Sequence, residues 1–202
     1  CGGGIYANAA KPEFSGSAIV KDNTSGDGAS VVDNLTFVST NGTYHAKLSG
    51  ALTGDAEIGI RVTENWINHS NAILVDAAEN YRITDNDLSH IVYDGDQYVP
   101  YLDTDSNTVK VASAAIITFN SNTGTTSETT VQKVQKGTEA ALAANTFVRD
   151  GYIFSGWNTA QNGSGGTNYA DRATITTSEN MTLYAQWIEL KHEGITLEYG
   201  ST

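Results

Sequence analysis

Short apolar segments recur along the first third of the chain, at intervals of roughly ten residues. They have strand-like compositions, and turns rich in Gly, Asn and Ser separate them. The segments lie at 14–20, 29–38, 44–48 and 58–62. Strands as short as these, so spaced, predict a sandwich, a barrel or a solenoid, and in a solenoid each coil buries its apolar face against the next. The pattern therefore favours an all-β or mainly β fold.

Charge and composition exclude several classes of partner. The 202 residues include 11 Lys and Arg against 23 Asp and Glu, a formal net charge of −12. This charge argues against nucleic acid and against anionic lipid, because both need a basic surface. No run of about 18 apolar residues is present, so we expect no membrane insertion. No signal-peptide pattern opens the chain.

The cysteine content fits a secreted protein that is held together by its sheets. The chain has a single Cys, Cys1, which cannot form an internal disulfide. We interpret Cys1 as a truncation point in preference to the lipid-bearing first residue of a mature lipoprotein. The expected location is extracellular.

The first 62 residues resemble part of a known solenoid. Gly-Gly-Gly-Ile-Tyr (2–6) and Ser-Gly-Ser-Ala-Ile-Val-Lys-Asp-Asn-Thr (15–24) are similar to the last coils of a right-handed parallel β-helix of the pectin-lyase-like class. Residues 48–54 and 58–60 look like the segment that closes such helices. The resemblance implies an open strand edge at the N-terminal coil, with Gly3, Ile5 and Tyr6 on it.

An acidic β-rich region follows at 63–112. Thr84 precedes a short segment that we expect to form a capped helical turn. Two hairpins are predicted next, one over 93–99 with Asp-Gly at its turn and one over 98–111 with its turn at 103–107. Pro100 lacks an N–H, so its strand is expected at a sheet edge. Residues 111–115 mark an expected boundary.

The segment from 116 to 187 carries the most informative motifs. It opens with strands at 116–120 and 129–134, and a short helix capped by Thr138 is expected over 138–144. Four motifs then stand in a fixed order: Thr-Phe-Asn (118–120), Gly-Tyr-Ile-Phe-Ser-Gly-Trp-Asn-Thr (151–159), Gly-Gly-Thr-Asn-Tyr (165–169) and Thr-Leu-Tyr-Ala-Gln-Trp (182–187).

These four motifs resemble the Listeria–Bacteroides repeat, also called the internalin B-type repeat. The resemblance implies a small β-grasp-like fold, in which a mixed sheet packs on a short helix. It also implies a module that is strung in arrays on bacterial surface proteins.

The end of the chain is expected to be a linker followed by one more strand. Residues 188–192 look like the linker, and 194–200 alternate as a strand without an obvious partner. The expected organisation is 1–62, terminal β-helix coils and closing strands; 63–112, an acidic antiparallel region; 113–188, the repeat; and 189–202, the linker and strand. Ile195, Leu197 and Tyr199 would give this last strand a second open edge.

One candidate metal site lies in the acidic region. Asp103, Asp105 and Asn107 place side-chain oxygens at alternate positions, as the start of a calcium loop does. The Gly expected next is Thr108, and the twelfth position is Ala114 where a calcium loop has Glu. The alternative interpretation is an acidic hairpin tip that keeps the protein soluble. No other cofactor is expected.

No catalytic constellation stands out, so we expect no enzymatic activity. The four His residues, at 45, 69, 90 and 192, have no metal-ligand spacing. Ser155 resembles a nucleophile elbow only superficially. Catalysis on a β-helix needs a groove across many coils, and this chain has at most two or three.

The aromatic residues of the repeat have two interpretations. They could form a platform on which a sugar stacks, or they could be the core of the repeat, which their motif positions favour. The five are Tyr152, Trp157, Tyr169, Tyr184 and Trp187.

Three functions are consistent with these observations. The first is a non-catalytic structural spacer of an adhesin-like surface protein, whose partners are neighbouring modules of the same protein. The second is an adhesin module that binds host glycan or host protein. The third is a subunit of an extracellular filament, in which identical subunits join through their open β edges.

Overall fold

The computed structural model describes residues 5–7, 11–25, 31–32, 34–37, 45–62, 72–124 and 126–191. It is mostly β, as the sequence predicts, with 53% strand and 3% helix. Two compact units divide the chain: Cys1–Ala115 with Lys133–Thr138, and Ile116–Gln132 with Glu139–Thr202. Each unit is described by itself below.

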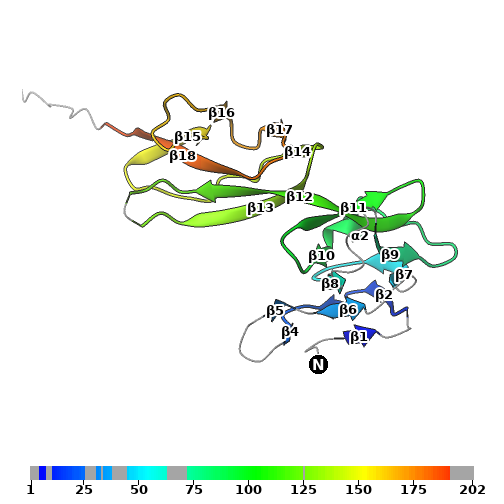
Figure 1. The fold of residues 1–202 in the computed structure, drawn as a ribbon. Helices are drawn as coiled ribbons and strands as arrows, with labels where there is room; N and C mark the ends of the chain where they lie inside the picture. Colours follow the sequence, from blue (N-terminus) through cyan, green and yellow to red (C-terminus); the bar gives the residue numbers. More distant parts are fainter. Residues whose placement is uncertain are drawn as a thin grey trace, which may run out of the picture. The chain divides into compact units, whose positions relative to one another are not determined.

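The first unit contains a parallel sheet whose strands stack one above another (Figure 1). Its order is β1 (Ile5–Ala7), β6 (Leu35–Phe37), β8 (Glu57–Val62) and β10 (Ile91–Tyr93), and β3 (Ile19–Val20) also pairs with β8. A small antiparallel ribbon, β4 (Thr24–Ser25) with β5 (Val31–Val32), lies between β3 and β6 in the chain. Every pairing within the main sheet is parallel, so the chain must leave the sheet and return between strands.

After β1, β6, β8 and β10, the chain passes from the first sheet into a second sheet. β2 (Glu13–Gly16), β7 (Ala46–Leu52) and β9 (Ile73–Ala77) pair in parallel in this order. The strands thus alternate between two sheets along the sequence, as the coils of a solenoid do. The narrower assignment to the pectin-lyase-like class stays a prediction.

Apolar residues that alternate along these strands form the core of the first unit. In β7, Ala46, Leu48 and Leu52 are fully buried, and Ile58 and Ile60 of β8 are fully buried as well. Each Leu or Ile of this kind contributes about 1.5–3 kcal/mol relative to exposure. Stacked coils, and no disulfide, hold this unit together.

The acidic region confirms one predicted helical turn and one of the two predicted hairpins. α2 (Asp85–Ser89) begins after Thr84, which caps it. β11 (Tyr98–Asp103) pairs antiparallel with β12 (Thr108–Asn120), as predicted. Among the described strands β11 has no other partner, so Pro100 does stand on an edge strand.

The hairpin predicted over 93–99 is wrong. β10 pairs in parallel with β8, and β11 pairs with β12, so the two strands do not pair with each other. An Asp-Gly dipeptide favours a tight turn locally. Here the buried edge of β8 is the better partner for residues 91–93, since Ile91 and Tyr93 enter the core there.

The second unit is built on a mixed sheet. β18 (Met181–Glu189) runs parallel to the end of β12 and antiparallel to β15 (Tyr152–Asn158). β16 (Asn168–Tyr169) extends the far edge of β15, and β13 (Thr129–Gln135) pairs with β12. β12 continues through residues 111–115, and the two units divide after Ala115. β18 reaches Glu189, so the strand includes the first two residues of the predicted linker.

The short helix predicted over 138–144 is wrong. Residues 139–141 form β14 (Glu139–Ala141), which pairs with β17 (Thr174–Thr176). Alanine has the highest intrinsic helix propensity, but propensity contributes little free energy per residue, and pairing with another strand overrides it. The side chain of Gln132 adds to it, donating to the carbonyl of Ala141 and accepting from the N–H of Ala143. The described residues of this unit contain no helix, so the β-grasp detail of a sheet on a helix stays unconfirmed.

Candidate functional site

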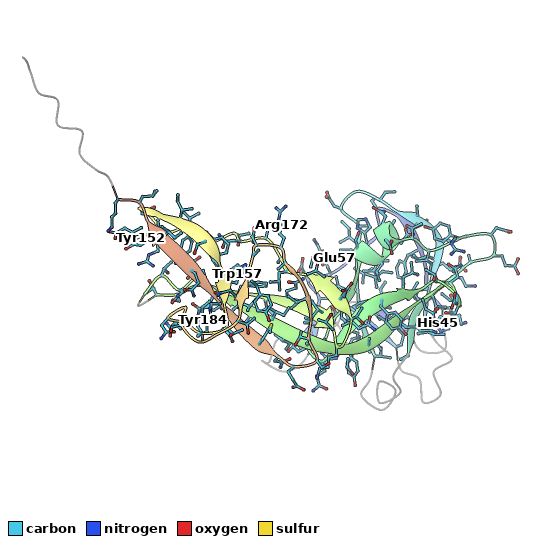
Figure 2. The ribbon with its side chains drawn as sticks, turned by 90° about the horizontal axis from the view of Figure 1, so that it is seen from above. His45, Glu57, Tyr152, Trp157, Arg172 and Tyr184 are labelled. Atoms are coloured by element: carbon cyan, nitrogen blue, oxygen red, sulfur yellow. The ribbon has the colours of Figure 1, made fainter. Side chains whose placement is uncertain are left out.

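Trp157 occupies the centre of the second unit (Figure 2). Its side chain is 1% exposed, and three phenylalanine rings surround it. The ring centroids of Phe119, Phe154 and Phe147 lie 4.8, 5.0 and 6.2 Å from it, all edge to face. A buried ring in this setting has no face left for a sugar, so Trp157 is a core residue, as its motif position predicts.

Gly156 is required by the close approach of a neighbouring strand. Its φ is +135°, and an added Cβ would lie 2.9 Å from the carbonyl oxygen of Tyr169. The register of β15 against β18 shifts between Phe154 and Gly156, which is a β-bulge. The bulge turns both Phe154 and Trp157 toward the aromatic cluster.

Asn158 organises the glycine-rich loop that follows it. Its Oδ1 accepts from the N–H of Ala160 at 2.6 Å, and its Nδ2 donates to Oδ1 of Asn168 at 2.7 Å. Gly166 packs so closely that an added Cβ would lie 2.1 Å from Asn158 Oδ1. The side chain of Asn158 is fully buried, and its hydrogen bonds hold the two ends of the loop together.

Trp187 fastens the last strand to the first turn of the unit. Its Nε1–H donates to the carbonyl of Ser121 at 2.8 Å, and its ring packs on Phe154 at 5.7 Å. Tyr152, Tyr169 and Tyr184 are partly buried. The two motif tryptophans, which could have bound a sugar by stacking, are therefore used to build the fold.

The predicted calcium ligands all lie in or beside the β11–β12 turn, but the side-chain oxygens of Asp103 and Asn107 already have partners. Oδ1 of Asp103 accepts from the backbone of Asp105 and Ser106, and its Oδ2 contacts the ammonium of Lys110. The hydrogen bond from Lys110, and next that from Ser106, lower the pKa of Asp103 to about 2.

Asn107 faces another part of the first unit. Its Oδ1 accepts from the N–H of Ile83 at 2.9 Å, and its Nδ2 donates to the carbonyl of Tyr81 at 2.9 Å. A cation at this turn would have to compete with these bonds and with those of Asp103. Calcium binding here stays a prediction. In the described part of the chain, no group of three or more His, Cys, Asp or Glu side chains could hold a metal ion.

Two of the four histidines are in the described residues, and they contact different groups. His45 is buried, and its Nε2 lies 2.7 Å from Oδ2 of Asp76 and 3.3 Å from the amine of Lys11. His90 contacts the carbonyl of Ala56 through Nδ1. His69 and His192 lie outside the described residues.

Asp87 is a buried carboxylate, and the sequence predicts only some of its hydrogen bonds. Its oxygens accept from the N–H of Leu52 at 2.8 Å, the hydroxyl of Tyr81 at 2.7 Å, and both N–H and Oγ1 of Thr84. The spacing of Thr84 and Asp87 signals a capping box. No local pattern signals the bonds from Leu52 and Tyr81.

The described residues of each unit form a hollow that is open to solvent. The hollow in the first unit has a volume of about 300 Å³, and its charged groups are largely paired, Lys21 with Glu57 and Lys133 with Asp96. The second, which we call the turn hollow, has a volume of about 410 Å³. The turn hollow is lined by Ser121, Thr123, Thr126, Glu128, Val148, Arg149 and Asp150.

The predicted assembly edges are only partly in view. Ile5 lies on β1, is 41% exposed, and pairs with Leu35 of β6. The backbone of Tyr6 continues that strand. Gly3, Ile195, Leu197 and Tyr199 lie outside the described residues.

Comparison with known proteins confirms the predicted repeat. Residues 116–186 match the family model of the Listeria-Bacteroides repeat domain. The match covers most of the second unit together with residues 133–138, and it leaves residues 1–115 unassigned. No curated protein and no solved structure matches the chain. Within the described residues, no helix is long and apolar enough to cross a membrane.

Proposed function

We propose that this chain is a non-catalytic segment of a bacterial cell-surface protein, and that it spaces or displays the modules on either side of it. The observation that carries the proposal is the use of the repeat's motif residues. Trp157, Asn158 and Trp187 are committed to the core, the loop and the strand contacts of their unit. A module whose distinctive residues build its own fold is suited to a structural role.

The family match supports the location. The repeat is typical of surface-associated proteins. The stacked parallel coils of the first unit suit the same role, because such coils extend by repetition and hold their shape without disulfides. An acidic chain with a net charge of −12 also stays soluble outside the cell.

The test of the non-catalytic proposal is a search for turnover. The purified chain is incubated with a panel of plant, bacterial and animal polysaccharides, and new reducing ends and unsaturated uronates are measured over a day. We expect both signals to match those of a boiled sample. Cleavage of any polysaccharide that scales with protein concentration would overturn the proposal.

Strand-edge assembly is a second candidate function, and one observation favours it. Among the described strands, β1 pairs only with β6, and β2 pairs only with β7. Within the described residues, both of these sheets thus end in a parallel strand that has one partner, and β1 and β2 follow one another in the chain. Such edges accept a strand from another chain.

Concentration-dependent mass tests this candidate. Sedimentation and negative-stain electron microscopy of the chain would reveal assemblies that lengthen with concentration, and Ile5→Lys on the β1 edge should abolish them. The matched control is Ile188→Lys, at an exposed isoleucine that is paired with Ile153. A chain that remains monomeric at high concentration would exclude assembly through these edges.

A further inference from the structure

The turn hollow has a rigid, hydroxyl-bearing floor. The N–H of Ser121 donates to the carbonyl of Glu128 at 2.9 Å, and the N–H of Glu128 donates to Oγ of Ser121 at 2.8 Å. Oγ of Ser121 also lies 3.1 Å from Oγ1 of Thr123. Ser121 is 2% exposed, and its carbonyl is held by Trp187. The floor is therefore tied to the core of the unit and keeps its shape.

Arg149 is held in place at the wall of the turn hollow. Its guanidinium carbon lies 3.8 Å from the centroid of the Tyr152 ring, which is a cation–π contact. The backbone reinforces the position, because the N–H of Tyr152 donates to the carbonyl of Arg149 at 3.1 Å. A planar guanidinium that is stacked in this way keeps its N–H donors fixed in direction.

The charged side chains around the turn hollow do not form ion pairs with one another. Among the described residues, no ion pair within 4.0 Å involves Arg149, Glu128 or Asp150. This contrasts with the hollow of the first unit, where the lysines are paired with carboxylates. One fixed donor group and two acceptor groups therefore face the same cavity with capacity to bind a ligand.

The balance of these groups narrows the class of ligand. Two carboxylates against one guanidinium leave a net negative charge, which disfavours an anionic ligand, and the guanidinium disfavours a metal cation. Hydroxyl groups suit the site, because each can donate to a carboxylate and accept from a guanidinium. Val148, 82% exposed at the rim, offers an apolar surface for the C–H face of a ring.

We propose that the turn hollow binds a neutral saccharide residue, with Arg149 donating to ring hydroxyls and with Glu128 and Asp150 accepting from them. A volume of about 410 Å³ accommodates one or two sugar rings. Such a site would let the repeat bind glycan weakly. The proposed spacer function does not depend on this binding and is compatible with it. A chain that binds sugar without cleaving it satisfies both proposals.

Saturation-transfer NMR on the full chain tests the site directly. The probes are methyl glycosides of neutral hexoses and of N-acetylhexosamines, their disaccharides, and glucuronic acid as the charged comparison. We expect transfer to at least one neutral probe, with a millimolar dissociation constant. Arg149→Gln and, separately, Asp150→Asn should each weaken that affinity by about tenfold or more.

The matched control is Arg172→Gln, at an exposed arginine of the same unit. Arg172 and Tyr152 lie well apart in Figure 2, so this variant should change the affinity by less than about twofold. Near-UV circular dichroism of the tryptophans checks that each variant is folded. Three results would overturn the proposal: no transfer to any neutral probe, binding that survives both hollow variants in folded protein, or binding confined to glucuronic acid.

Discussion

At the scale of single residues, one asparagine and one glycine set how closely neighbouring coils of the first unit can stack. Asn34 is 3% exposed. Its Oδ1 accepts from the N–H of Asn23 at 2.9 Å, and its Nδ2 donates to Oδ1 of Asp94 at 3.1 Å. Gly59 lies against this amide, and no larger residue would fit there. The buried asparagine therefore links the segment after β3 to the segment after β10, provided that position 59 carries no side chain.

Gly59→Ala should destabilise the first unit strongly. The added Cβ would lie 2.2 Å from Nδ2 of Asn34 and 2.7 Å from Oδ1 of Asp94, so a buried hydrogen bond must move. We expect a loss of about 2–3 kcal/mol in the free energy of unfolding, measured by urea denaturation. The matched control is Gly50→Ala in β7, whose Cβ would meet only Ser15 Cβ at 3.3 Å. Equal losses for the two variants would contradict the proposed role of Asn34.

At the scale of elements, the five-residue helix α2 is stabilised by its buried carboxylate, Asp87, which accepts hydrogen bonds from residues outside the helix. Burial raises the pKa of Asp87, but the hydrogen bonds from Leu52, Tyr81 and Thr84 lower it by more, so that the pKa lies below its usual value of 3.8. A helix this short is marginal by itself. The bond from Leu52 joins it to β7 and makes it part of the solenoid.

Acid should weaken this unit in a predictable window. A carboxyl whose pKa is lowered on folding stabilises the protein above its unfolded pKa, and that stability is lost as the pH falls. Asp87 and Asp103 both have lowered pKa values, so we expect stability to decline from pH about 4 toward about 2. Melting temperatures measured across that range check the expectation, and a flat profile would contradict it.

Asp87→Asn measures how much the buried carboxylate of α2 contributes to the free energy of unfolding. An amide cannot accept from all of the donors around it, so the variant should lose about 3 kcal/mol at neutral pH and show a shallower acid decline. Asp85→Asn, at an exposed residue of the same helical turn, is the matched control and should cost well under about 1 kcal/mol. If both variants behave alike, the buried network is not what stabilises α2.

The raised pKa of Tyr81 predicts a loss of stability at alkaline pH. Burial, and then the hydrogen bond to Asp87 and its charge, raise the pKa of Tyr81 to about 12. A raised pKa means that stability is full below the unfolded value of 10.0 and falls as the pH rises toward about 12. Tyr81→Phe should cost about 1.5 kcal/mol at neutral pH and flatten this alkaline decline in thermal melts. An unchanged alkaline slope would show that another group titrates.

Local patterns predicted the elements that local interactions decide. The β11–β12 hairpin and the cap at Thr84 depend on residues close in sequence, and both were predictable. The hairpin over 93–99 and the helix over 138–144 were not, because partners far along the chain, β8 and β17, determine their structure. For the same reason, no pattern predicts that Asn34 bonds to Asp94, 60 residues away.

At the scale of the whole molecule, the two units are built in different ways. The first stacks parallel coils, and the second closes a mixed sheet over an aromatic cluster around Trp157. The repeat was predictable because its four motifs encode that cluster and its loop. The turn hollow was not, because Ser121, Glu128 and Arg149 belong to turns without a motif of their own. Its groups come together only through the fold of the second unit.

In the proposed role, this segment works on the outer surface of a bacterial cell. The most direct measurement is immunogold electron microscopy of intact cells that make the protein, with antibodies raised against residues 116–186. We expect label along the outside of unpermeabilised cells, and loss of that label after brief treatment of the cells with protease. Label that is found only in the interior of sectioned cells would contradict the claim.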